Sequence, residues 1–235
     1  MKLVAAYVTR NEADRWFEHS LASVGEIVDH IHVFDDQSDD ETVEVARTFA
    51  DVVTVRPDQC PSFDEDEGRF RATAWADMGE TLGLTKGDVV LAIDADEIVA
   101  LTAHTDGRSA LLWNLNNAPK ADGFRVKIHE SFGVDDDGTP LVRTDGWWGD
   151  ISGVRLAKWR EGSFKGGGGS GSVPHCPAIE PAVAFSIVHL GYALEADRIK
   201  KYQWYSSRNG FGHNPAHIAS IVQTPTLHRL EGIHV

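Results

Sequence analysis

The sequence is poor in cysteine, in long apolar segments and in basic residues. Its two cysteines, Cys60 and Cys176, are too few for a disulfide framework and lack CxxC metal spacing, so we expect ordinary reduced thiols. No apolar run approaches the roughly 20 residues that a membrane helix needs, which predicts a chain without a transmembrane segment. The apolar start, residues 1–8, is too short for a signal peptide and runs into polar and charged residues. It is typical of a first strand and indicates a cytoplasmic protein.

Acidic residues outnumber basic ones, with 36 Asp and Glu against 22 Lys and Arg and a formal net charge of −14. A nucleic-acid groove needs a basic stripe, so we expect no nucleic-acid partner. The charge does not exclude a phosphate ligand, because a bound cation can invert the local field. The apolar fraction of 42% and the charged fraction of 25% are ordinary for a globular protein.

The first hundred residues alternate between strand and helix patterns. Short links between such elements imply parallel strands joined by right-handed crossovers. We therefore predict the α/β class, with a Rossmann-like, mostly parallel sheet flanked by helices. Within it, Ser38 and Glu41 fit a capping box that would start the second helix. The predicted strands are residues 2–8, 31–34, 52–55 and 88–93, and the predicted helices are residues 13–24, 38–51 and 67–82.

The pattern becomes less regular after about residue 104. Strands are predicted at residues 124–128, 153–159 and 183–190, followed by a helix at 195–207 and an irregular end. We expect one domain with two halves, residues 1–103 and 104–235. The glycine-rich residues 166–171 fit either a native mobile loop or an engineered linker, and composition does not separate the two.

An acidic tripeptide, Asp94-Ala95-Asp96, directly follows the most apolar predicted strand. A carboxylate at the end of a buried strand is costly to desolvate unless a cation compensates it. Two carboxylates two residues apart point the same way from an extended segment and can together hold Mg²⁺ or Mn²⁺. The alternative is a loop start with solvated acids, since this tripeptide alone is a weak signal.

A second acidic pair, Asp35-Asp36, ends the second predicted strand. Ligands of open parallel sheets bind beyond the carboxyl ends of the strands, so both acidic pairs should converge on one crevice. A carboxylate there can accept hydrogen bonds from a ribose or a base N–H. The alternative is that Asp35 and Asp36 merely open a turn.

Three ordered motifs in the first hundred residues resemble family 2 glycosyltransferases of the GT-A fold, as found in small bacterial or bacteriophage enzymes. The first is a strand followed by Arg10-Asn11-Glu12, and the second is the run from Val33 to Thr42. The third is Arg71 in a helix, followed by the segment Gly87 to Glu97 that contains Asp94-Ala95-Asp96.

The resemblance implies a metal-dependent transfer of a sugar from a nucleoside-diphosphate sugar to an acceptor hydroxyl that the sequence does not identify. Residues 1–103 would bind the donor and residues 104–235 would face the acceptor. Asp96 would bind Mn²⁺ or Mg²⁺ and act in catalysis. Arg71 would approach the base or the diphosphate of the donor, and Arg69 is a near-equal alternative for this role. The implied contacts to the nucleotide sugar are Thr9, Arg10, Asn11, Asp35, Asp36, Arg71, Asp94 and Ala95.

The second half resembles the family more loosely. His189, in an H-x-G-Y segment, would supply a further metal ligand by this resemblance, although a core histidine bonded to backbone is the alternative. Related enzymes often carry a V-H-E segment whose glutamate is a plausible base, but Val173 to Pro177 has no carboxylate. The catalytic base and the stereochemistry therefore stay open, and Asp150 and Asp145 are candidates for the base.

Two other functional classes are compatible with the acidic tripeptide. Phosphatases of the haloacid-dehalogenase type also place D-x-D after a strand, but normally after the first strand and with Thr or Val where this chain has Ile98. A non-catalytic module that binds a nucleotide sugar or a metal is the other alternative, since fold alone does not imply catalysis.

Overall fold

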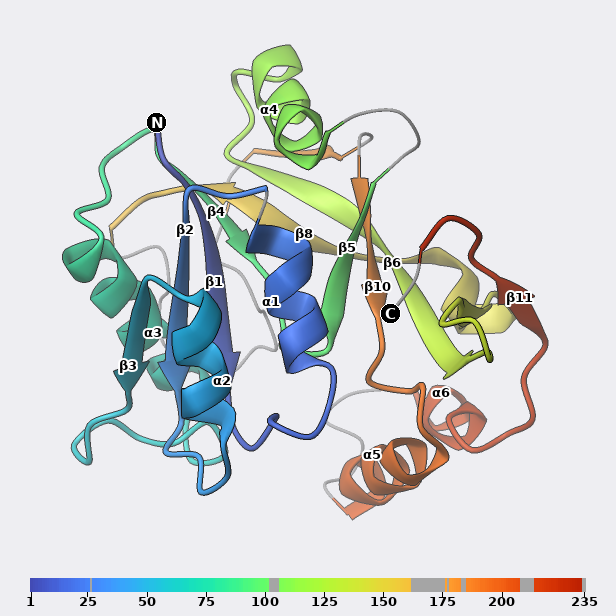
Figure 1. The fold of residues 1–235 in the computed structure, drawn as a ribbon. Helices are drawn as coiled ribbons and strands as arrows, with labels where there is room; N and C mark the ends of the chain where they lie inside the picture. The colour runs from blue at the N-terminus through green and yellow to red at the C-terminus, as the bar shows by residue number, and fades with distance from the viewer. Residues whose placement is uncertain are drawn as a thin grey trace.

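The structure is a computed structural model in which residues 1–25, 27–101, 106–161, 176, 178–182, 185–207 and 214–233 are described. Helices pack on both sides of a central sheet (Figure 1). The glycine-rich residues 166–171 lie outside the described part of the chain. Within that part, no helix has the length and apolar content to cross a bilayer.

The first half of the chain forms the predicted parallel sheet. Its strands are β1 (Leu3–Thr9), β2 (His30–Asp35), β3 (Val52–Val55) and β4 (Val89–Ala92), in the order β4-β1-β2-β3. All three pairings are parallel, and Thr9 lies opposite Asp35 in the register of β1 and β2. The carboxyl ends of these strands therefore open on one edge, as the sequence predicted.

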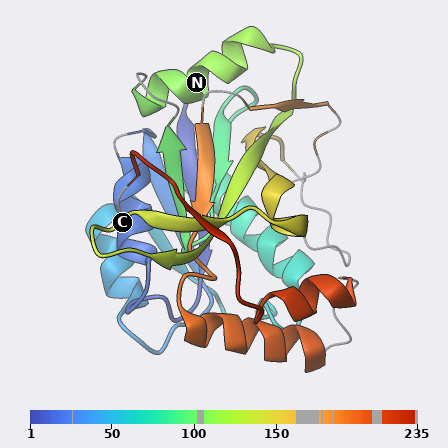
Figure 2. The same cartoon turned by 90° about the vertical axis from the view of Figure 1, so that its right-hand side faces the viewer.

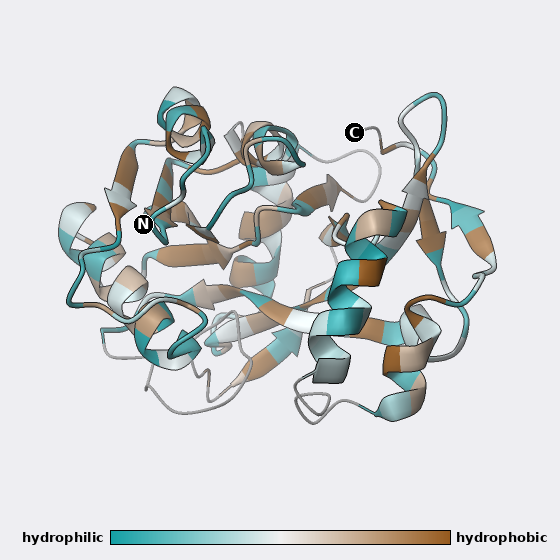
Figure 3. Cartoon of the chain, turned by 90° about the horizontal axis from the view of Figure 1, so that it is seen from below, coloured by the Kyte–Doolittle hydropathy of each residue, from teal (hydrophilic) through white to brown (hydrophobic). Residues whose placement is uncertain are grey.

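Helices α1 (Phe17–Gly25) and α2 (Thr42–Phe49) cover one face of this sheet, and α3 (Glu67–Thr81) covers the other. The alternation of side chains along β1 explains the division. Leu3, Ala5 and Tyr7 join the cluster of buried residues that contains α1, whereas Val4 packs with residues of α3. Apolar colour follows the strands of this sheet (Figure 3).

The predicted capping box of α2 is wrong. The Ser38 N–H and Oγ both donate to the Asp35 carboxylate, at 2.8 and 2.5 Å, so Ser38 does not cap the helix. The helix begins only at Thr42, whose N–H donates to Asp40 Oδ1 at 3.0 Å. Asp35, at the end of β2, therefore binds the Ser38 side chain, which is not available to cap the helix.

The second half extends the sheet with mixed pairing. Strand β8 (Ile151–Lys158) pairs antiparallel with β4 and with β6 (Gly123–Val134). Strand β10 (Phe185–His189) lies between β6, which is parallel to it, and β5 (Glu97–Leu101), which is antiparallel. The remaining elements are α4 (Gly107–Asn117), β7 (Pro140–Arg143), the 3-10 helix η1 (Gly146–Asp150), β9 (Ile179–Pro181), α5 (Glu195–Ser207), α6 (Pro215–Ser220) and β11 (Leu227–Arg229).

Helix α5 matters most for the site, because it lies near the edge where β1, β2 and β4 end (Figures 1 and 2). It follows β10 after a short turn. The Arg15 guanidinium, in the segment between β1 and α1, binds Asp197 of α5 at 2.8 Å. The two halves of the chain therefore meet directly at this edge.

Candidate active site

A cleft of about 470 Å³ lies at the carboxyl ends of β1, β4 and β10, against α5. Segments from both halves of the chain line it, so residues far apart in sequence face each other there. Many of the residues predicted from the sequence lie in its lining: Thr9, Arg10, Asp36, Arg71, Asp94, Ala95, Asp96 and His189.

Asn11, Asp35 and Asp150 do not belong to this lining. Asn11 adopts a φ of 55°, accepts the Asp39 N–H on its side chain at 3.0 Å and thereby joins the loops after β1 and β2. Asp35 is fully buried beneath the cleft by Ser38 and Thr9. Asp150 is exposed at the end of η1.

The Asp36 carboxylate closes one end of the cleft. It is 1% exposed and accepts the Phe63 N–H at 3.0 Å and the Nε–H of Arg56. Arg10 lies 3.8 Å from its Oδ2 atom and is half exposed, so this guanidinium can turn toward a ligand. Arg71, on α3, lines the same region with its guanidinium over the Phe63 ring at 5.1 Å.

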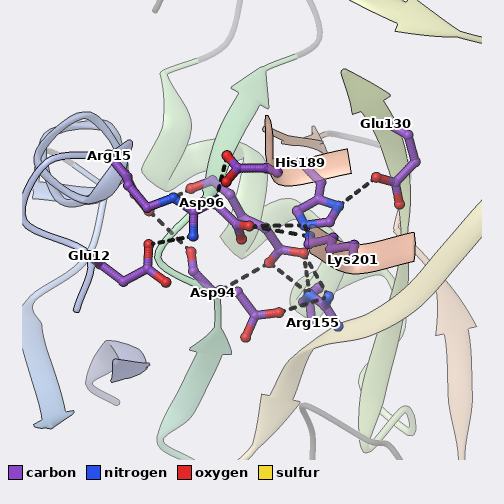
Figure 4. A network of polar contacts seen from close by, with 11 residues as sticks. Glu12, Arg15, Asp94, Asp96, Glu130, Arg155, His189 and Lys201 are labelled. Carbon is purple, nitrogen blue, oxygen red and sulfur yellow. Dashed lines mark hydrogen bonds and ion pairs between the residues drawn. The ribbon is translucent and has the colours of Figure 1, made fainter. Parts of the chain in front are cut away.

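Asp96 and His189 form the centre of the cleft (Figure 4). The His189 Nε2 atom lies 3.2 Å from Asp96 Oδ2, and its Nδ1 atom contacts Glu130 at 2.5 Å. The register of the sheet explains this second contact, because His189 lies opposite Glu130 where β10 pairs with β6. The Lys201 ammonium approaches from α5, 3.8 Å from Asp96 Oδ2 and 3.4 Å from His189 Nε2.

These charges shift the titration of both central groups. Burial disfavours the charged imidazole, but Glu130 and Asp96 more than offset this and raise the pKa of His189 to about 10. Burial likewise opposes the charged form of Asp96, yet His189 and Lys201 hold the pKa of Asp96 well below its usual range. Without a metal, the centre of the cleft therefore pairs a protonated imidazole with two carboxylates, and a bound cation would take the place of the imidazole proton.

The turn between Asp94 and Glu97 is held from below by Arg155 of β8. Its guanidinium binds the Glu97 carboxylate at 2.7 and 3.0 Å and lies 3.6 Å from Asp94 Oδ2. Glu97 also accepts the Asp94 N–H at 3.1 Å. Burial raises the pKa of Glu97, which Arg155 opposes, so the guanidinium compensates a carboxylate that is 1% exposed.

A fourth group of charges comes from the segment after β1. The Glu12 carboxylate lines the cleft, and Arg15 donates to its Oε2 atom at 3.3 Å. The Glu12 N–H donates to Thr42 Oγ1 at 2.7 Å, which fixes the backbone at this position. Burial, opposed by Arg15 and reinforced by Asp96, raises the pKa of Glu12 to about 7.

Asp96 and His189 fit two ligands of one divalent cation. Two ligands at right angles, each about 2.1 Å from an ion, are about 3.0 Å apart, close to their separation here. In the described part of the chain, no group of three His, Cys, Asp or Glu side chains is placed to hold a metal. The other coordination positions would therefore belong to a ligand or to water, as is usual for Mg²⁺ at phosphate sites.

Gly191 lies directly against this pair. A Cβ atom at this position would clash with Lys201, Asp96 and His189. The glycine in the H-x-G-Y segment therefore lets the backbone pass beside the polar groups without filling the space between them.

The sequence did not identify Glu130, Arg155 or Glu12 as site residues. Glu130 and Arg155 are buried charges inside strands, and their partners come from other strands of the sheet. Glu12 stands within a quoted motif, but only the placement of the cleft shows that its side chain enters it. The one signal that the sequence offered is that Glu130 occupies a position in the same alternation along β6 as the apolar residues Val126 and Ile128.

Comparisons with known proteins return solved structures only. No family model and no curated protein sequence match the chain. Structures of GT-A fold glycosyltransferases and of a nucleotidyltransferase are among those similar to it. S. aureus TarS 1-349 in complex with UDP has 14% identity and a TM-score of 0.48, covering 94% of this chain and 70% of that one.

Two further structures overlap a smaller part of the chain. A 4-diphosphocytidyl-2C-methyl-D-erythritol synthase has 18% identity and a TM-score of 0.43, covering 67% of this chain and 75% of that one. Glucosyl-3-phosphoglycerate synthase from Mycobacterium tuberculosis, solved with Mn²⁺ and UDP-glucose, has 19% identity and a TM-score of 0.34 and covers 55% and 43%. At these identities and TM-scores, the likeness assigns neither a family nor a function to the chain. Any assignment of function therefore rests on the geometry of the cleft.

Proposed function

We propose that this chain is a metal-dependent glycosyltransferase that moves a sugar from a nucleoside-diphosphate sugar to an acceptor hydroxyl. The observation that carries the proposal is the convergence of Asp36, Asp94, Asp96 and His189 on one cleft. These residues follow or end β2, β4 and β10, at the edge of the sheet where α/β proteins bind nucleotides.

The end of the cleft at Asp36 suits the nucleoside. Its carboxylate is held by Arg56 and the Phe63 N–H, so it is oriented before a ligand arrives. Because two donors already satisfy part of its acceptor capacity, Asp36 would accept one further N–H or hydroxyl from a base or ribose. Thr9 and Asp35 support this end from beneath through their own hydrogen bond.

The middle of the cleft suits the diphosphate and the sugar. Arg10, Arg71 and Lys201 line it and can neutralise phosphate oxygens. Asp94, oriented by Arg155, is placed to accept hydroxyls of the ribose or sugar. Asp96 and His189 would hold Mn²⁺ or Mg²⁺, which when bound acts as a Lewis acid toward the charge on a departing diphosphate.

Ligand-induced stabilisation tests the donor class. A true donor raises the melting temperature through mass action, by an amount that grows with its concentration. UDP, GDP and their sugars should be compared with and without Mn²⁺, and the released nucleoside diphosphate should be measured for the sugars that bind. No shift and no release with any member of this panel would contradict the proposal.

The variant Asp96→Ala tests the role of the metal pair. It should abolish turnover while the circular dichroism spectrum stays unchanged, because its carboxylate is at the cleft and outside the apolar core. Asp136→Ala, at an exposed position, is the matched control and should keep full activity. Full metal-dependent turnover in Asp96→Ala would refute the assignment, and donor binding without any release would favour the non-catalytic module.

A further inference from the structure

Four of the carboxylates that line the cleft differ in how far their charges are already paired. Asp36 is bound by Arg56 and the Phe63 N–H, and Asp94 faces Arg155. Asp96 is engaged by His189 and Lys201. In the proposed function, each of these three binds the donor or its metal.

Glu12 differs from them in position and in pairing. Only its Oε2 atom meets a cation, Arg15 at 3.3 Å, and Oε1 has no hydrogen-bond partner among the described residues. Figure 4 places its side chain on the side of the cleft opposite His189 and Glu130. A carboxylate oxygen that is free to accept a proton thus enters the cleft beside Asp94 and Asp96.

The backbone that carries Glu12 is fixed on three sides. Its own N–H donates to Thr42 Oγ1 at 2.7 Å, and the Ala13 N–H donates to Asp40 Oδ2 at 3.2 Å. Arg15, three residues on, binds Asp197 of α5 at 2.8 Å. This anchoring holds a group within reach of a substrate at a low cost in entropy.

The environment of the carboxyl suits proton transfer. Its side chain is 19% exposed, so a proton taken up can pass to solvent. Its pKa of about 7, raised by burial and by Asp96, is near the value at which a general base works best at neutral pH. An ordinary exposed glutamate has a pKa of about 4.3 and is a much weaker base.

We propose that Glu12 is the general base of the transfer, which accordingly inverts the configuration of the anomeric carbon. This inference rests on the proposed function. The acceptor O–H bond breaks as its proton passes to Glu12, and the acceptor oxygen bonds to the anomeric carbon. The bond from that carbon to the phosphate oxygen breaks, and its electron pair leaves with the nucleoside diphosphate.

The role of Glu12 as general base is tested by measuring the release of nucleoside diphosphate with Mn²⁺ present and water as the acceptor. The donors are UDP-glucose, GDP-mannose and related nucleotide sugars. Glu12→Gln should lower kcat about 10²–10⁴-fold, the usual contribution of general-base catalysis, while the Kd for the nucleoside diphosphate stays within about twofold. Glu12→Asp should restore part of the rate. Asp14→Asn, exposed in the same segment, is the matched control and should leave kcat unchanged.

The pH profile and the product separate a base from a merely structural residue. In the wild type, kcat should fall as pH drops below about 7, because a protonated carboxyl accepts no proton, and the residual activity of Glu12→Gln should lack this limb. Proton NMR of the freshly released sugar should show the inverted anomer.

Three results would overturn the inference alone while the proposed function stands. They are a Glu12→Gln variant with more than a tenth of the wild-type kcat, a wild-type rate independent of pH between 5 and 8, and a product with retained configuration. The wild-type profile and the product anomer decide the matter even if Glu12→Gln does not fold. No release from any donor by the wild type would overturn the proposed function together with the inference.

Discussion

The buried pair of Arg155 and Glu97 makes a strong prediction about stability. Arg155→Met keeps much of the volume of the side chain but removes the guanidinium that binds Glu97 at 2.7 and 3.0 Å. Removing one partner of a buried pair typically costs about 3–5 kcal/mol, because the other charge stays buried without compensation. For a chain of this length 1 kcal/mol corresponds to roughly 2–4 °C, so the melting temperature should fall by about 6–20 °C.

Urea unfolding at several pH values provides the assay. Burial raises the pKa of Glu97, and Arg155 is the charge that opposes this rise most strongly, so its removal should raise the pKa of Glu97 further. A group whose pKa is higher in the folded than in the unfolded state stabilises the fold at pH values below its pKa in the unfolded state. This contribution is lost as the pH rises through the pKa of the folded state. The loss of stability in Arg155→Met should therefore be small near pH 4 and grow toward neutral and alkaline pH.

The double variant Glu97→Gln/Arg155→Met identifies the cause. It removes the uncompensated charge, so it should be more stable at pH 8 than Arg155→Met alone. Arg47→Met, which breaks an exposed pair with Glu44, is the control and should change stability by less than about 0.5 kcal/mol. A loss below about 1 kcal/mol in Arg155→Met, or an equal loss in the double variant, would refute the reasoning.

Two further predictions concern the cleft and the packing of α3. Glu130→Gln weakens the hydrogen bond that orients His189. The affinity for Mn²⁺, measured by titration calorimetry, should therefore fall about 10–100-fold while the fold stays intact. An unchanged affinity would exclude an orienting role for Glu130. Gly79→Ala places a methyl group against the Trp159 ring and should cost about 1–3 kcal/mol in urea unfolding, whereas Gly25→Ala, with open space around it, should not destabilise. Equal stability of the two glycine variants would contradict the packing at α3.

The parallel half of the fold could be predicted because local signals agree there. The apolar run of β4 stops abruptly at Asp94, and alternation between strand and helix patterns fixes the direction of each strand. The same local signals placed the acidic pairs at one edge. Strand β5 was not predicted, although its residues after Glu97 are apolar, because it follows β4 after a link too short for the helical crossover that the alternating pattern implies.

The partners within the cleft could not be predicted in the same way. Glu130 meets His189 only because β10 inserts beside β6, a pairing that spans 59 residues of sequence. Likewise, the contact of Arg155 with Glu97 depends on the position of β8 next to β4. Such contacts follow from the order of strands in the sheet, and no periodicity in a single sequence specifies that order.

The pairing of β10 with β5 has a consequence for how the protein folds. His189 lies opposite Glu97 in that register, so β10 closes a chain loop that contains α4, β6 and β8. Long-range pairings of this kind form slowly, since the entropy of loop closure is lost before the contacts compensate it. In a refolding experiment, the helices and the parallel strands should therefore form before the chain gains any affinity for Mn²⁺, and metal binding should report the final step of assembly.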